Sequence, residues 1–394
     1  MLQTPRQLLA RMLTLGIVVT AVAGIALATS VRSEPGGAAV PRIHTGGETG
    51  AYYTNFCPPL AKALAETGNK YECTPSDGSF NNMVRVVAEP RDFGFAQLDV
   101  LTLERDQFDD SSTFQIVRSN DVRECLFAVA RNLELKTFGD IAVRADELRF
   151  ILPPEDSGSA GTFRYLQFID NDLAHAGSIR HVGDVNEAIR LALAADDTVA
   201  MFVQFADPDN PRFQLINRLG GHFIPVIDRN ILSARIDGNS IYFAEETAVT
   251  DARWTAKGTK VITACTPLVV FTGGEGRITD PAQAEAHRKA VATLKSLPAA
   301  RLHPVDGFFS SLLKRTRELS AAAVTKLVDV SQAAREKAKP LIDKAKEATS
   351  KALESSKPHF DEAKETGAKT LEKAKEAVKE LIAPPPANGD KPHG

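Results

Sequence analysis

The chain has 394 residues, of which 43% are hydrophobic and 25% are charged, and its formal net charge at pH 7 is −3. This length allows two or three domains, and the composition is that of an ordinary globular protein. Because the charges are nearly balanced, the sequence shows no footprint of nucleic-acid binding, and we expect no nucleic-acid partner.

The N-terminal segment predicts export. Arg6 and Arg11 precede an apolar run that ends in Ala26-Leu27-Ala28, a small-residue pattern that suits signal peptidase. We interpret residues 1–28 as a signal peptide, with an uncleaved N-terminal anchor as the alternative, and residues 29–40 as a spacer. The expected location is therefore the periplasm, where the protein is either soluble or N-terminally anchored.

The four cysteines are expected to form disulfides, because export brings the chain into an oxidising compartment. Four cysteines allow three connectivities. We predict Cys57–Cys73, which joins the first helix to the following strand, and Cys125–Cys265, which joins two distant segments. A nucleophilic cysteine would need an activating base, and the surrounding residues show none.

The segment RIHTGGETGAYYTNF, Arg42 to Phe56, predicts a short strand, a glycine turn and the start of a helix. Glycine lets the backbone approach a ligand closely, and the first N–H groups of a helix attract carboxylate or phosphate. Tight packing of the turn is the alternative to binding. The candidate ligand-binding residues here are Thr45, Gly46, Gly47, Glu48 and Thr49.

Three later strands end in the same way. The strand Lys70–Ser76 leads into SDGSFNN, the strand Asp92–Val100 has a polar break, and Leu148–Ile169 repeats the order of strand, Gly/Ser turn and helix. In an open parallel sheet the ends of the Arg42, Lys70–Ser76 and Asp92–Val100 strands lie along one edge, where α/β proteins bind ligands, and the Leu148–Ile169 turn belongs to the second lobe. The candidate residues at these ends are Ser76, Asp77, Ser79, Gln97, Asp99, Ser157, Ser159 and Thr162.

The second half of the chain repeats the pattern of the first. A further strand and turn, Thr198–Asn210, contains Phe202 and Gln204. We predict two α/β lobes that face each other across a cleft and are hinged by the strands Glu124–Arg131 and Lys260–Phe271. The predicted boundaries are 41–125 for the first part of lobe 1, 126–262 for lobe 2 and 263–307 for the return segment of lobe 1.

The motifs TGGETGAYY, SDGS, AQLD and SGSAGT occur in this order after a leader. Over Arg42 to Leu297 the chain resembles the TAXI-type extracytoplasmic solute receptors of TRAP transporters, which have the type II periplasmic-binding-protein fold. The pair Cys57 and Cys73 also suits many members of that family. The chain departs from the family pattern at Asp77, at Leu98, which replaces the usual serine, and at the inserted Ala160.

The resemblance implies a receptor that closes on a small-molecule solute, an organic acid or an amino acid, and presents it to membrane transporter subunits. The residues that line the pocket in this interpretation are Tyr52, Tyr53, Phe202 and Phe205, although such residues are as often core. Arg85 and Arg164 are either a charged clamp or solvated surface residues, and the same holds for Arg180.

The composition changes after Gly307. Residues 308–382 are rich in Ala, Lys and Glu and predict a helical tail, while 383–394 predict a disordered end. KPLIDKAKEATSKALE repeats as KPHFDEAKETGAKTLE at an offset of 18 residues, and Pro340 and Pro358 are expected to kink or separate the helical pieces. The tail is a solvated spacer, a coiled-coil contact for a partner, or a weak membrane attachment.

The sequence contains no recognisable G-x-S-x-G, H-E-x-x-H or P-loop motif, and its histidines lack metal-ligand spacing, except that His175 and His181 lie near each other. We therefore expect no catalytic residues, no metal and no cofactor. The leading hypothesis is a non-enzymatic periplasmic solute-binding receptor. The alternative is an envelope scaffolding protein that keeps the receptor fold and acts on membrane or partner through its tail.

Overall fold

The computed structural model describes residues 39–105, 108, 113–207, 209–250, 258–302, 316–344, 346–348 and 350–351. The predicted leader, most of the spacer, Pro358 and the C-terminal end 383–394 lie outside the described residues. No helix among the described residues is both long enough and apolar enough to cross a bilayer.

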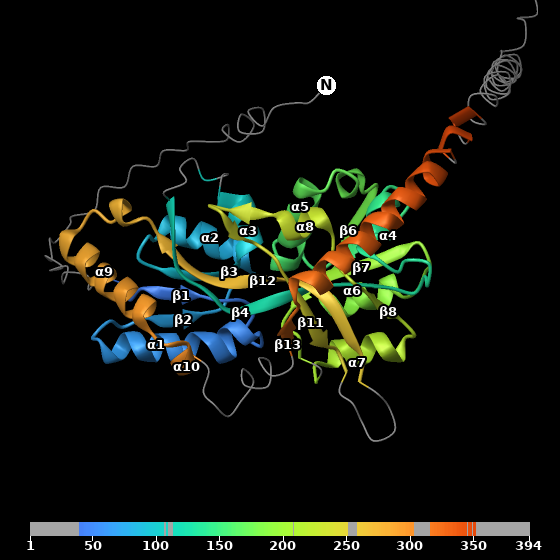
Figure 1. The fold of residues 1–394 in the computed structure, drawn as a ribbon. Coiled ribbons are helices and arrows are strands. Elements are labelled where there is room, and N and C mark those ends of the chain that lie inside the picture. The colour runs from blue at the N-terminus through green and yellow to red at the C-terminus, as the bar shows by residue number, and fades with distance from the viewer. Residues whose placement is uncertain are drawn as a thin grey trace, which may run out of the picture. The chain divides into compact units, whose positions relative to one another are not determined.

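The first lobe is built on a sheet with the strand order β2-β1-β3-β12-β4 (Figure 1). The strand β3 is buried along its whole length, and Phe93, Phe95 and Ile43 fill the core. Apart from the two long strands described below, its elements are β1 (Arg42–His44), the π-helical turn η2 (Tyr52–Phe56), α1 (Cys57–Glu66), β2 (Glu72–Thr74), α2 (Ser79–Ala88), β3 (Phe93–Gln97), α3 (Leu98–Glu104), η6 (Glu275–Arg277), α9 (Pro281–Ser296) and α10 (Ala299–Leu302).

The second lobe continues the sheet in the order β4-β7-β5-β6, with β8 and β11 paired to the long strands. The helix α5 begins at a serine cap, where the Ser157 side chain accepts a hydrogen bond from the Ala160 amide. The elements are α4 (Phe138–Val143), β5 (Arg149–Leu152), α5 (Gly158–Ile169), η5 (Leu173–His175), β6 (Ser178–His181), α6 (Val185–Ala192), β7 (Thr198–Gln204), α7 (Pro211–Arg218), β8 (His222–Ile224), α8 (Arg229–Ser233), β9 (Arg235–Ile236), β10 (Asn239–Ser240) and β11 (Phe243–Ala248).

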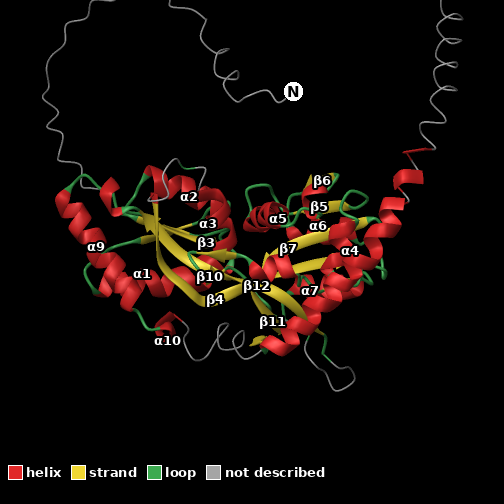
Figure 2. Cartoon of the chain, turned by 45° about the horizontal axis from the view of Figure 1, so that its top comes forward, coloured by secondary structure: helices red, strands yellow, loops and turns green. Residues whose placement is uncertain are grey.

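Two long strands, β4 (Phe114–Ala130) and β12 (Lys260–Gly273), run antiparallel through both lobes (Figure 2). The strand β4 begins at Phe114, well before the predicted strand Glu124–Arg131, and it passes through polar residues near Asp121. The backbone stays extended there because β12 runs alongside and absorbs the irregularity in a register shift between Pro267 and Val269. The predicted two-lobed α/β fold is confirmed.

Both predicted disulfides are present in the structure. Cys57 and Cys73 join α1 to β2, with a Cα–Cα distance of 5.9 Å. Cys125 and Cys265 lie directly opposite each other on β4 and β12, where the chain passes between the lobes. The second bond therefore crosslinks the two strands of the connection.

The tail is part of the second lobe over its described residues. The strand β13 (Thr316–Glu318) pairs with β11, and a helix over residues 321–344 lies beside α4, drawn in orange-red in Figure 1. Ser331 and Arg335 are buried against the lobe, so this part of the tail is not the solvated spacer that we considered. The fold class thus includes a C-terminal helical extension.

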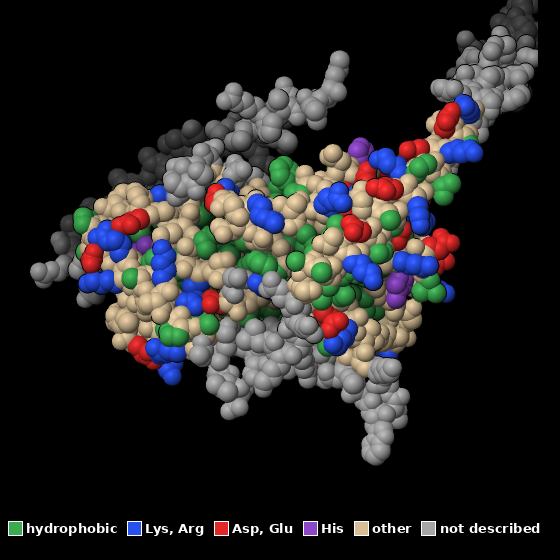
Figure 3. All heavy atoms as spheres, viewed as in Figure 1, with side chains coloured by type: hydrophobic (Ala, Val, Ile, Leu, Met, Phe, Trp, Pro, Cys, Tyr) green, Lys and Arg blue, Asp and Glu red, His purple; other side chains and the backbone are tan. Residues whose placement is uncertain are grey.

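The helix continues through Pro340, so this proline does not separate the helical pieces as one of our two expectations had it. A proline inside a helix leaves the carbonyl four residues earlier without its amide partner. That carbonyl belongs to Glu336, which is exposed, so water can satisfy it. On the face shown in Figure 3, basic and acidic side chains are interspersed along this helix, so its visible surface has mixed charge.

Candidate functional site

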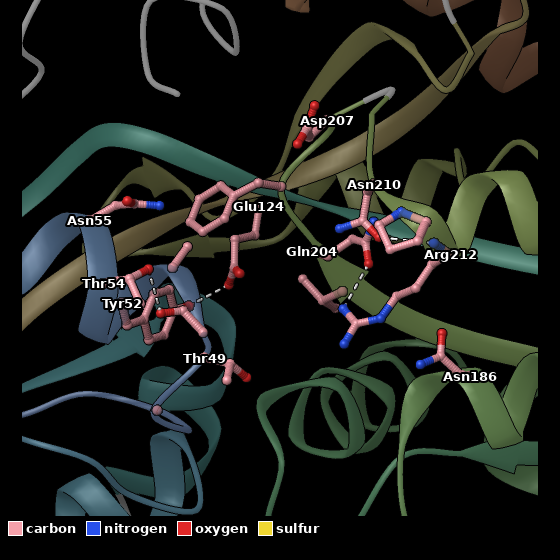
Figure 4. A pocket seen from close by; sticks show the side chains of 16 residues that line it. Thr49, Tyr52, Thr54, Asn55, Glu124, Asn186, Gln204, Asp207, Asn210 and Arg212 are labelled. Carbon is pink, nitrogen blue, oxygen red and sulfur yellow. Dashed lines mark hydrogen bonds between the residues drawn. The ribbon is translucent and has the colours of Figure 1, made fainter. Parts of the chain in front are cut away.

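A cavity of about 490 Å³ lies between the two lobes. One wall comes from residues 46–55 of the first lobe and the other from residues 203–212 of the second, with Glu124 of the crossing strand β4 between them (Figure 4). This volume is typical of a small-molecule site. The polar side chains of the lining are Thr49, Tyr52, Thr54, Asn55, Glu124, Asn186, Gln204, Asp207, Asn210 and Arg212.

The first-lobe wall is organised around the carboxyl group of Glu124, which is 6% exposed. Its Oε2 atom accepts a hydrogen bond from the Tyr52 hydroxyl and another from Nε2 of Gln97 at 2.7 Å. Burial raises the pKa of Glu124 to about 7 and raises the pKa of Tyr52 well above its usual value. Tyr52 is therefore a neutral donor, and Glu124 changes its charge near neutral pH.

The second-lobe wall carries a cation and a buried amide. Arg212 follows the helix start Asn210-Pro211, and its Nη1 atom donates to Oε1 of Gln204 at 3.0 Å. Burial lowers the pKa of Arg212, but a guanidinium stays charged at neutral pH. Gln204 is 6% exposed, and its Nε2 has no hydrogen-bond partner among the described residues. This wall therefore offers donors for which a ligand could supply the acceptors.

The titration of Glu124 gives a first prediction. The pKa rises from 4.5 to about 7 on folding, so the folded state holds the proton more tightly. Its contribution to stability is complete below pH 4.5 and is lost as the pH rises through 7, by up to about 1.4 kcal/mol for each pH unit. Glu124→Gln should remove this dependence. Denaturant unfolding of both proteins from pH 4.5 to 8 measures it, and equal slopes would contradict the assignment.

Part of the predicted site lies in this cavity. The sequence candidates that line it are Gly46, Thr49, Tyr52, Gln204 and Phe205. Phe202 instead lies in the core, 2% exposed and stacked on Phe127. The other candidates of the first turn are outside the lining: Thr45 is buried and donates to the Thr74 carbonyl, Gly47 and Glu48 are exposed, and Tyr53 is half-buried.

The candidates at the other strand ends lie near one another, as expected for the carboxyl ends of parallel strands. They are held by contacts within the fold and do not line the cavity. The cause is close contact between α2, α3 and α5: a Cβ on Gly161 would lie 2.9 Å from Val100. Ser79 donates to Gln97, Asp99 accepts from Tyr242, Ser157 caps α5, Ser159 accepts from the Val203 amide, Ser76 donates to the Thr45 carbonyl, Thr162 is buried, and Asp77 is exposed.

The arginines that we considered as a clamp also lie outside the cavity lining. Arg85 donates to the Pro75 carbonyl, Arg164 pairs with Glu104 at 2.9 Å, and Arg180 is exposed. The polar lining residues that the sequence analysis missed are Thr54, Asn55, Glu124, Asn186, Asp207, Asn210 and Arg212. Two signals were available: a lone acid in the apolar strand segment ECLFAVA, and the helix-start pair Asn210-Pro211 just before Arg212.

One group of side chains has the spacing of a metal site. Cys125, Cys265 and Glu245 place their ligand atoms within 4.8 Å of one another. The two sulfur atoms are bonded to each other, and Arg123 pairs with Glu245 at 2.6 Å. The group is therefore a crosslink beside an ion pair.

A scan against protein-family models finds no match for this chain, and a search of the curated proteins finds no relative. Among solved structures, YhfZ from Shigella flexneri is 13% identical with a TM-score of 0.39, over 67% of this chain and 89% of that one. PhnD1 from Prochlorococcus marinus in complex with methylphosphonate is 13% identical with a TM-score of 0.39, over 76% and 98%. A TctC solute binding protein from Polaromonas is 11% identical with a TM-score of 0.36, over 76% and 98%. At TM-scores below 0.5 these likenesses do not bear on what this chain binds.

Proposed function

We propose that this protein is a periplasmic solute-binding receptor of the TAXI type, which captures an organic acid or an amino acid between its lobes and delivers it to the membrane subunits of a TRAP transporter. One observation carries the proposal: two chemically different walls, one from each lobe, face a single cavity. Capture and delivery break no bond, so the receptor is not an enzyme.

The chemistry of the two walls suits such a ligand. A carboxylate can accept hydrogen bonds from Arg212, whose side chain lines the cavity. On the opposite wall, Glu124 and the hydroxyl oxygen of Tyr52 can accept hydrogen bonds from an ammonium or hydroxyl group. A ligand with a carboxylate at one end and an ammonium or hydroxyl group at the other would contact both lobes at once.

Contact with both lobes also provides the mechanism of closure. The lobes are joined by β4 and β12, and a ligand that touches both walls gains more contacts in a closed arrangement than in an open one. Binding therefore shifts the equilibrium toward closure. The Cys125–Cys265 bond keeps the two connecting strands in register while the lobes move.

A thermal-shift panel of organic acids and amino acids tests the proposal. A cognate ligand at 100 times its Kd adds about 2.7 kcal/mol, which raises Tm by about 3–4 °C in a protein of this size. Native mass spectrometry of the purified protein should show the same compound class bound. If no compound raises Tm and no small molecule co-purifies, the receptor proposal fails.

The alternative role, an envelope scaffolding protein that acts through its tail, has one observation in its favour. The docked tail helix exposes Leu341 and Val330, with 71% and 52% of their surfaces accessible. Exposed apolar side chains on a helix suit contact with membrane or protein. Two results together would favour this role: liposome or partner binding that disappears when the tail is removed, and no rise in Tm with any compound of the thermal-shift panel.

A further inference from the structure

The side chain of Gln97, at the end of β3, fills a closed space beside the cavity. It is 5% exposed and lies between the first turns of α2 and α5. Its Oε1 accepts from the Ser79 hydroxyl at 2.7 Å, and its Nε2 donates to Glu124 at 2.7 Å. A Cβ on Gly158 would overlap the Gln97 amide, so only glycine leaves room for it.

The space around this amide is polar and specific. The Ser79 hydroxyl is a donor to the carbonyl end, and the Glu124 carboxylate is an acceptor for the amine end. The carbonyl oxygen also lies near the positive ends of two helices, α2 and α5, which favours an oxygen acceptor there. These surroundings would suit the amide or carboxylate of a separate molecule equally well.

Gln97 lies behind the wall that Glu124 and Tyr52 form on one side of the ligand cavity. Its partner Glu124 lines the cavity, and so does Tyr52, which donates to the same Glu124 oxygen. Gln97 itself is outside the lining. A ligand that reaches Glu124 and Tyr52 therefore meets a wall that is closed from behind by the Gln97 amide.

We propose that Gln97 is a built-in occupant that shortens the binding cavity and sets the maximum length of the ligand. Its side chain beyond Cβ has the heavy atoms of acetamide. Without it, a small amide or carboxylate occupies the space between Ser79 and Glu124, and longer ligands reach the first turns of α2 and α5. The consequence for ligand length rests on the proposed function, whereas the refilling of the space does not.

Gln97→Ala with acetamide tests the occupied space directly. The variant should lose about 5 °C in Tm, and 100 mM acetamide should restore about 3 °C of it. The wild type and the isosteric Gln97→Met, in which the space stays filled, should shift by less than about 1 °C. The proposal is overturned if acetamide stabilises all three proteins equally, or none of them.

A double-mutant cycle keeps the inference testable if Gln97→Ala folds poorly. Gly158→Ala adds a methyl group where the Gln97 amide lies, so it should lower Tm in the wild-type background. In the Gln97→Ala background the same methyl group enters free space and should cost much less. Losses that simply add would mean that the two residues do not compete for one space.

The ligand-length consequence is measured with succinate, glutarate and adipate. Relative to the wild type, Gln97→Ala should shift the affinity ratio toward the longer acids by about tenfold. If the wild type binds an acid and the ratio does not change, Gln97 does not set the length and the receptor proposal stands. If the wild type binds none of these three acids, homologues of the acid found in the thermal-shift panel replace them. If that panel also shows no binding and no small molecule co-purifies, the receptor proposal fails, while the acetamide result still decides whether Gln97 fills a separable space.

Discussion

Arg335→Ala is expected to destabilise the protein by about 3–5 kcal/mol, although the residue lies in a tail outside the lobes predicted from the sequence. The Arg335 side chain is 9% exposed and is surrounded by three carboxylates. It contacts Asp170, lies 2.7 Å from Asp172 through Nη1, and lies 3.1 Å from Asp228 through Nε. Asp170 and Asp228 are almost completely buried, so removal of the guanidinium leaves two buried charges uncompensated.

Denaturant unfolding measures this loss, and Lys339→Ala is the matched control. Lys339 lies one turn further along the same helix and pairs with Asp172 at 3.2 Å, but its side chain is 60% exposed. An exposed pair of this kind contributes about 0–1 kcal/mol. If Arg335→Ala costs no more than Lys339→Ala, the helix is not held against the lobe in solution. Recovery of stability in an Arg335→Ala, Asp228→Asn double variant would support the charge explanation.

The tail helix over residues 321–344 is held to the second lobe by direct contacts. The Gly139 amide donates to the Ser331 hydroxyl at 3.1 Å, and a Cβ on Gly139 would overlap the Ser331 backbone, so the helix and α4 touch directly. Lys346 pairs with Asp146 further along. Because these partners and those of Arg335 all come from the second lobe, the helix is expected to move with that lobe when the cavity closes.

The lobes and their connection could be predicted from the sequence because local signals and general rules agree there. The turn after His44 and the turn before Ser159 both follow apolar strands and precede helical spacing, and topology then brings such strand ends to one edge. The pairing of Cys125 with Cys265 follows from the two strands that pass between the lobes. These predictions depend only on the path of the backbone and not on the positions of individual side chains.

The binding side chains could not be predicted in the same way, because their roles depend on distances between residues far apart in the sequence. Ser79 and Gln97 are polar strand-end residues that look like ligand contacts, but the close approach of α2 and α5 makes them contact each other. Arg335 is one of many basic residues in a repetitive tail, and only the folded lobe shows that three aspartates surround it.

The remaining large effect concerns ligand affinity. Arg212→Met should weaken the binding of a carboxylic acid by about 100–1,000-fold, equivalent to about 3–4 kcal/mol, because the guanidinium is the cation of the second-lobe wall. The unliganded variant should keep its Tm or gain slightly, since burial already lowers the pKa of Arg212 and makes its charge costly.

Calorimetric titration of an acid identified in the thermal-shift panel measures the loss, and Arg218→Met is the control. Arg218 ends the same helix, α7, but is exposed and outside the cavity lining, so its replacement should leave affinity within about threefold. The uncharged amide of the same acid should bind wild type and Arg212→Met about equally, because it brings no anion to the guanidinium. If Arg212→Met lowers the affinity for acid and amide by the same factor, Arg212 shapes the cavity without pairing with a carboxylate; if it lowers neither, the anion binds elsewhere.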